Sequence, residues 1–139
     1  MSDTDLLTAA LVAEHAAVYG YGVLGGRLDD ETRAAARTAF DSHRNRRDLL
    51  TAALTERGAE APVTQAAYDV VVPDRAGALL LAVRLEEGLS QRWRDLLAGT
   101  DDVELRRLAL AGLNETAVRA TQWRVRARVT PATVALPGA

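Results

Sequence analysis

Apolar residues recur at alternating steps of four and three along four stretches of the chain, the spacing of helices that bury one face. Glycine, proline and acidic residues mark the ends of these stretches, as expected at helix termini. From these start and stop signals we predict four helices, from about Asp3 to Gly25, Asp29 to Gly58, Asp74 to Gly99 and Thr100 to Arg126. The proline-containing tail TPATVALPGA is predicted to be irregular, either packed on the helices or frayed.

The lengths of the connections predict how these helices are arranged. Helices one and two are joined by a few residues, as are helices three and four, so each pair forms an antiparallel hairpin. The connection over residues 59–73 is longer, and when extended it spans roughly 50 Å at about 3.3 Å per residue. A helix of about 28 residues is about 42 Å long, so this connection can run the whole length of a bundle. The stretch YDVVV within it could instead be a β-strand, but that strand would have no partner.

We therefore predict an all-α fold, a ferritin-like four-helix bundle made of two antiparallel helical hairpins joined by a long crossover. The bundle is expected to occupy residues 1–128 and the tail residues 129–139.

The predicted inward-facing stripe of each helix, its seam, is apolar except near its middle, and one polar residue from each middle can face the other helices. These four residues, one per helix, are Glu14, His43, Glu86 and Glu115. On the third helix the seam runs through Leu79, Ala82, Glu86, Leu89, Trp93 and Leu96. On the fourth helix it runs through Leu108, Ala111, Glu115, Val118, Gln122 and Val125.

Hairpin geometry predicts that the four polar residues meet. In an antiparallel pair, residues at equal distance from the turn face each other, which pairs Glu14 with His43. The same rule pairs Glu86 with Glu115, and both pairs lie about fifteen residues from their turns. An ionised carboxylate buried without a partner costs at least several kcal/mol, so this cluster requires protons, a metal cation or an arginine.

The stretches AEHAAVYGYGVLGGRL, HRNRRDLL and AVRLEEGLSQRWRDLL resemble the small bacterial family called domain of unknown function 4439, within the ferritin-like superfamily. In di-iron members of that superfamily, helices one and three each supply a glutamate, and helices two and four each supply Glu-x-x-His. The resemblance matches those ligands to Glu14, His43, Glu86 and Glu115, in chain order. Phe40 stands in place of the second-helix glutamate, and Val118 in place of the fourth-helix histidine. The resemblance thus implies an incomplete di-iron centre.

Two interpretations of this centre remain open. In the first, the protein is a non-catalytic structural or interaction module without a cofactor, and Arg47 joins Glu14, His43, Glu86 and Glu115 in a buried polar network. Arg47 is assigned this role because it lies one turn beyond His43 on the same seam. In the second, the protein is a metal-binding or redox protein in which Glu14, His43, Glu86 and Glu115 coordinate one divalent ion, either iron, manganese or zinc.

Composition narrows the possible partners and location. A net charge of -2 and a pI near 5.7 give no general attraction to nucleic acid or anionic membranes, so neither is an expected partner. The chain has no cysteine for disulfide or thiolate chemistry, and its first residues lack a secretory signal pattern. The apolar run AGALLLAV is too short to cross a bilayer. We expect a cytoplasmic homodimer and predict that His15 is an ordinary hydrogen-bonded side chain.

Two further stretches each carry a functional and a structural interpretation. SHRNRRD is the densest basic cluster, and interleaved acids favour a solvated face with ion pairs over a nucleic-acid site. YGYGVLGG has four glycines late in the first helix. These glycines allow either close packing against a neighbouring helix or the approach of a ligand or another chain to the backbone, and we expect packing.

Overall fold

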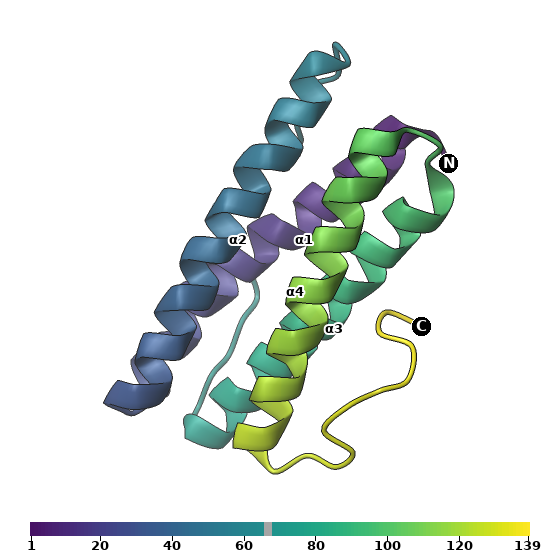
Figure 1. Ribbon diagram of the computed structural model, residues 1–139. Helices are drawn as coiled ribbons and strands as arrows, with labels where there is room; N and C mark the ends of the chain where they lie inside the picture. The colour runs from purple at the N-terminus through teal and green to yellow at the C-terminus, as the bar shows by residue number, and fades with distance from the viewer. Residues whose placement is uncertain (66–67) are drawn as a thin grey trace.

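The computed structural model describes residues 1–65 and 68–139, and four α-helices make up most of them (Figure 1). These are α1 (Asp3–Leu24), α2 (Asp30–Glu56), α3 (Arg75–Gly99) and α4 (Val103–Ala127), with a short 3-10 helix η1 (Gly25–Arg27) after α1. No β-strand occurs within the described ranges, YDVVV included. The prediction of an all-α fold with four helices is therefore confirmed.

Each α-helix begins at a side chain that caps its free backbone N–H groups. Ser2 forms a capping box with Asp5 at the start of α1. The carboxylates of Asp29, Asp74 and Asp102 accept backbone hydrogen bonds at the starts of α2, α3 and α4. The predicted helix starts are thus correct to within a few residues.

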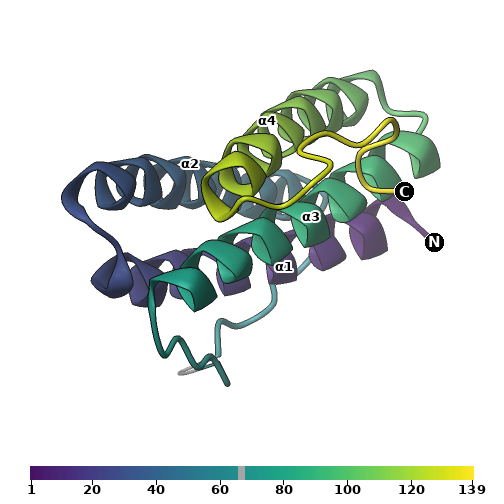
Figure 2. The same ribbon diagram turned by 90° about the horizontal axis from the view of Figure 1, so that it is seen from below.

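The helices form two hairpins that pack through α1 and α3. Figure 2 shows α2 and α4 in one layer, with α1 and α3 in the other. Close backbone approaches join α1 to α2, α1 to α3, and α3 to α4, whereas α2 and α4 lie farther apart. The crossover returns the chain so that α3 runs parallel to α2, as predicted.

The crossover is held against α1 in a regular order. Thr64 bonds His15 at 3.1 Å, the ring of Tyr68 lies 5.1 Å from that of Tyr19, and Arg27 Nε donates to the carbonyl of Val72 at 3.1 Å. Later crossover residues thus meet later residues of α1 and then η1, so the two segments run in the same direction. The contact with Thr64 also gives His15 the ordinary hydrogen-bonded role predicted for it.

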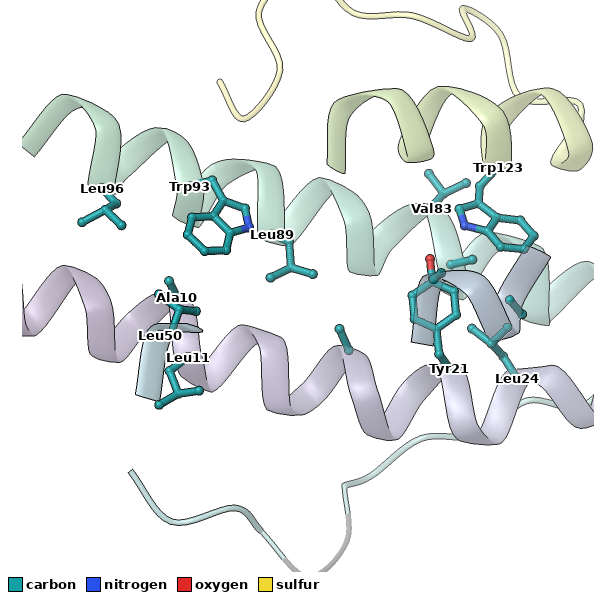
Figure 3. Close-up of a cluster of buried hydrophobic side chains, with 14 of the residues drawn as sticks. Ala10, Leu11, Tyr21, Leu24, Leu50, Val83, Leu89, Trp93, Leu96 and Trp123 are labelled. Carbon is teal, nitrogen blue, oxygen red and sulfur yellow. The ribbon is translucent and has the colours of Figure 1, made fainter. Parts of the chain in front are cut away.

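The buried faces of α1, α2 and α3 supply most of the core. Every seam residue named for α3 is buried. Figure 3 shows Trp93 of α3 between Leu89 and Leu96, pointing toward the α1 side that carries Ala10 and Leu11. The segment Asp3–Arg27 is long and apolar enough to cross a membrane by composition alone, but its apolar face is buried in the bundle.

The predicted seam of α4 is wrong by about one residue. Val118 and Val125 face outward, with 59% and 62% of their surface exposed. The stripe that packs into the bundle is instead Leu105, Ala109, Gly112, Thr116, Ala120 and Trp123. A Cβ atom on Gly112 would collide with the indole ring of Trp93, and the hydroxyls of Ser90 and Thr116 bond at 2.9 Å. Small residues turn toward α3 because only they let the two helices approach around the large Trp93 ring.

The C-terminal tail, residues 129–139, folds back beside α3 and α4 (Figure 1). Its carbonyl at Ala132 accepts a hydrogen bond from the largely buried Arg124 at 3.2 Å. Gly138 has φ of 78° and lies so close to the carbonyl of Ser90 that a side chain would collide there. These contacts place the tail on the bundle.

Candidate functional site: a buried carboxylate–imidazole cluster

Three of the four predicted polar residues meet at the centre of the bundle. Glu14 from α1, His43 from α2 and Glu86 from α3 are each at most 1% exposed. Nδ1 of His43 lies 2.7 Å from Oε2 of Glu14, and Nε2 lies 2.8 Å from Oε1 of Glu86. A single imidazole thus joins two carboxylates from two other helices. We call these three residues the buried triad.

The protonation of His43 follows from this arrangement. Both ring nitrogens face carboxylate oxygens, and only the imidazolium form can donate at both positions. Burial acts to lower the pKa of His43, but the hydrogen bonds to Glu14 and Glu86 outweigh it and raise the pKa to about 9. Burial raises the pKa of Glu14, and the bond from His43 partly opposes that rise. The triad is therefore a charged cluster at neutral pH, with His43 as its internal cation.

Tyr21 belongs to the same cluster, although the sequence pattern alone did not select it as a site residue. Its hydroxyl donates to Oε1 of Glu86 at 2.6 Å, and its ring stacks on that of His43 at 5.4 Å between centroids. Figure 3 shows the hydroxyl pointing away from α1 toward the core. Burial raises the pKa of Tyr21 well above 10, so Tyr21 is a permanent donor to Glu86. The available signal was its position seven residues after Glu14, on the same helix face.

Glu115 does not join the buried triad, because the rotation of α4 carries it to the rim between α2 and α4. Its side chain is 30% exposed and lies 2.7 Å from Nη2 of Arg46. It also accepts hydrogen bonds from Ser42 at 2.9 Å and from Arg119 at 3.1 Å. Burial acts to raise the pKa of Glu115, but the bond and charge of Arg46, the bond from Ser42 and the charge of Arg119 together outweigh it, and the pKa is lowered. The prediction that four polar side chains converge is therefore corrected to three.

The arginine beside the cluster is Arg119, not Arg47. One guanidinium nitrogen of Arg119 lies 3.5 Å from Oε1 of Glu86, and another bonds Glu115 at 3.1 Å. Arg47 instead pairs with Asp48 at the surface, at 2.9 Å. Arg119 follows Val118 directly, so the same one-residue rotation that turns Val118 outward brings Arg119 to the position expected for a ligand. Its spacing of four residues from Glu115 was a usable sequence signal.

The basic stretch SHRNRRD supplies several separate contacts rather than one surface. Arg44 lies over the ring of Phe40, Arg46 binds Glu115, and Arg47 pairs with Asp48. Two of its arginines are thus neutralised by acids within the same chain.

The side chains present do not fit the di-iron ligand set that the family resemblance implied. The described part of the chain contains no group of three or more metal-ligating side chains arranged to hold an ion. Both nitrogens of His43 are already bonded, and Glu115 is bound to two arginines. Val118 points outward, and Arg119 places a positive charge beside Glu86. An arginine in this position repels a second cation rather than binding it.

Two carboxylate oxygens of the triad remain without a hydrogen-bond partner among the described residues. They are Oε1 of Glu14 and Oε2 of Glu86, and both are buried. Buried polar atoms are normally satisfied, so these two atoms are the part of the cluster that still has capacity to bind a proton, a water molecule or an ion.

Comparisons with known proteins agree with this architecture and name no activity. No curated protein matches the chain. A crystal structure of a conserved hypothetical protein, rv2844, from Mycobacterium tuberculosis is similar, with a TM-score of 0.86 and 34% sequence identity. The alignment covers 89% of this chain and 96% of that one. The family described as a domain of unknown function, DUF4439, matches residues 6–139. The chain therefore belongs to the DUF4439 family.

Proposed function

We propose that this protein is a non-catalytic helical module in which a former di-iron centre of the ferritin-like kind survives as a structural ion cluster. The observation that carries the proposal is the bonding of both His43 nitrogens to buried carboxylates. A histidine that coordinates a metal needs one unprotonated ring nitrogen, whereas both nitrogens of His43 donate hydrogen bonds to carboxylates. The cluster then fixes the register of α1, α2 and α3, because sliding one helix along another would leave a buried charge without its partner.

Burial of the cluster further supports a structural role. Glu14, His43 and Glu86 are at most 1% exposed, and Tyr21 is 2% exposed. A redox centre must admit its substrate, and the three side chains of the buried triad bond one another in the core, while Tyr21 also lines a cleft between α1 and α2. The fourth helix supplies Arg119, which supports charge balance rather than metal chemistry.

The second candidate is a protein that binds one divalent ion. Its support is the pair of buried carboxylate oxygens without partners, Oε1 of Glu14 and Oε2 of Glu86. Such an ion would compete with the proton shared between His43 and Glu14, and Glu115 would have to leave Arg46 and Arg119 to join it.

Metal analysis of protein purified without chelator separates the two candidates. The structural proposal predicts no stoichiometric iron, manganese or zinc after titration with each ion, in the wild type and in Glu86→Gln alike. A Glu60→Gln variant removes an exposed carboxylate and serves as the control. Stoichiometric metal that is lost in Glu86→Gln but kept in Glu60→Gln would overturn the structural proposal and support the second candidate.

The outward face of α4 supports an interaction role for the module. Its residues keep the alternating four–three spacing of a helix-packing seam: Ala111, Glu115, Val118, Gln122 and Val125. All of them are exposed except Glu115, which bonds Ser42 and Arg46 of α2. This pattern is nearly symmetric about Val118, with apolar residues at its centre and ends. A second copy packed antiparallel about a two-fold axis at Val118 would place Ala111 near the partner's Val125. We infer a homodimer through this face.

Analytical ultracentrifugation tests the dimer. Val118→Glu would place two like charges at the proposed axis and is expected to give a monomer with unchanged helix content. Val63→Glu, at a site on the crossover that is 93% exposed, is the control and should leave the oligomeric state unchanged. A wild-type monomer, or equal behaviour of the two variants, would contradict the interface.

A further inference from the structure

A second candidate site lies outside the buried triad, in a cleft of about 440 Å³ between the end of α1 and the first half of α2. One wall is formed by three glycines of YGYGVLGG that were expected to serve helix packing, Gly22, Gly25 and Gly26. The other wall carries Arg37 and Arg44 of α2. We call this the glycine–arginine cleft.

The glycines of this wall are not explained by packing. Gly20, which lies outside this wall, is explained by packing, because a Cβ atom there would press on Leu85. Gly25, by contrast, has helical angles, φ of -56° and ψ of -31°, and no neighbour within 4 Å of an added Cβ. Gly22 would meet only Phe40, at an ordinary 3.9 Å. Alanine would fit both positions and would stabilise the helix, so these glycines keep the cleft open at a cost to stability.

The arginines of the opposite wall carry unbalanced charge. Arg37 and Arg44 form no ion pair with any described residue, and Arg44 lies over the ring of Phe40 with 5.6 Å to its centroid. A third arginine in the lining, Arg33, is held by the carbonyls of Gly25 and Leu28 and by Asp30.

One acid also lines the cleft, Asp41, which lies between the two free arginines on the same helix face. It can offset one positive charge of the three, so the lining keeps an excess of positive charge.

We propose that the glycine–arginine cleft binds a small organic anion, a phosphate or carboxylate joined to a compact apolar group. The anionic group would bind the guanidinium groups of Arg37 and Arg44, which match oxyanions geometrically, against the opposing charge of Asp41. The apolar group would lie against the open backbone at Gly22 and Gly25. The cleft volume lies in the range of ordinary small-molecule sites. This inference does not depend on the function proposed for the buried triad.

Phenyl phosphate, benzoate and inorganic phosphate are suitable probes, observed by NMR. The backbone amides of Gly22, Gly25 and Gly26 report directly from the cleft wall. Saturable shifts of these signals with phenyl phosphate or benzoate are expected, and the tighter of the two tells whether the natural anion is a phosphate or a carboxylate. Inorganic phosphate should bind more weakly than phenyl phosphate, because it lacks the apolar group.

Two variants test the walls separately. Arg37→Gln with Arg44→Gln should weaken binding by roughly tenfold or more, whereas Arg84→Gln with Arg128→Gln removes the same charge elsewhere and should not. Gly25→Ala should weaken binding while the melting temperature stays equal or rises. The proposal is overturned if no probe gives saturable shifts, if both arginine pairs weaken binding equally, or if Gly25→Ala binds like the wild type.

Discussion

Raising the pH should remove the positive charge of His43 and destabilise the fold. The pKa of His43 is about 9 in the folded protein against 6.5 as its ordinary value. A folded-state pKa above the unfolded one adds stability that is fully present below pH 6.5 and is lost as the pH rises through 9. At about 1.4 kcal/mol per pH unit, this difference is worth about 3 kcal/mol. The raised pKa of Glu14 acts with the same sign, since its ionisation also opposes folding as the pH rises.

Urea unfolding followed by circular dichroism, at steps from pH 6 to pH 9.5, measures this loss directly. The free energy of unfolding should fall by about 3 kcal/mol over that range. Tyr21 stays protonated throughout, because its pKa is raised well above 10.

The second histidine supplies a matched control for this experiment. His15→Gln should keep the full pH dependence, because His15 lies at the surface beside Thr64 and burial lowers its pKa instead of raising it. His43→Gln should be less stable at pH 6 and should lose most of the slope. A flat profile in the wild type, or an equal slope in His43→Gln, would refute the assignment of His43 as a buried cation.

Two further matched pairs test the contacts that define α4. Arg119→Met should destabilise the protein by about 3 kcal/mol because it removes a cation beside buried charge, whereas Arg47→Met, at a surface pair, should cost less than about 0.5 kcal/mol. Equal losses in urea unfolding would contradict this order. Gly112→Ala should cost about 1–3 kcal/mol through collision with Trp93, whereas Gly88→Ala, with open space around it, should raise the melting temperature. Tolerance of Gly112→Ala would mean that α4 is not seated on Trp93.

Most of the architecture was predictable because it depends on local signals and lengths. Aspartates at helix starts, glycines near helix ends and one long connection were sufficient for four helices in two hairpins. The seam of α3 was correct because its large side chains, such as Leu89, Trp93 and Leu96, leave little choice of buried face. The crossover followed from its length and from the absence of a partner strand for YDVVV.

The orientation of α4 was not predictable from periodicity. Its buried stripe consists largely of small residues, including Ala109, Gly112 and Ala120, which a hydrophobic pattern weights weakly. The neighbouring stripe contains Val118 and Val125, which look more like a core. What decides between them is the fit of Trp93 against Gly112, a contact between helices that spacing along one helix does not encode.

The prediction of the candidate site was wrong where it depended on the orientation of α4. Glu14, His43 and Glu86 lie on the first three helices and are buried as predicted, and the structure brings them together. Glu115 and Arg119 lie on α4. Because the predicted buried face of α4 was wrong by one residue, Glu115 was predicted to lie in the core and Arg119 was not selected. Arg47 was selected on spacing from His43 alone, and its side chain reaches the surface acid Asp48 instead.

Whether an imidazolium joins two buried carboxylates is tested most directly by measuring the protonation state of His43. The chain has two histidines, so nitrogen NMR of the imidazole rings gives two separable titrations. Both ring nitrogens of His43 should carry protons at pH 7, and the ring should lose one near pH 9. A ring that titrates at or below 6.5, or one whose nitrogen is unprotonated and bound to metal at neutral pH, would contradict it.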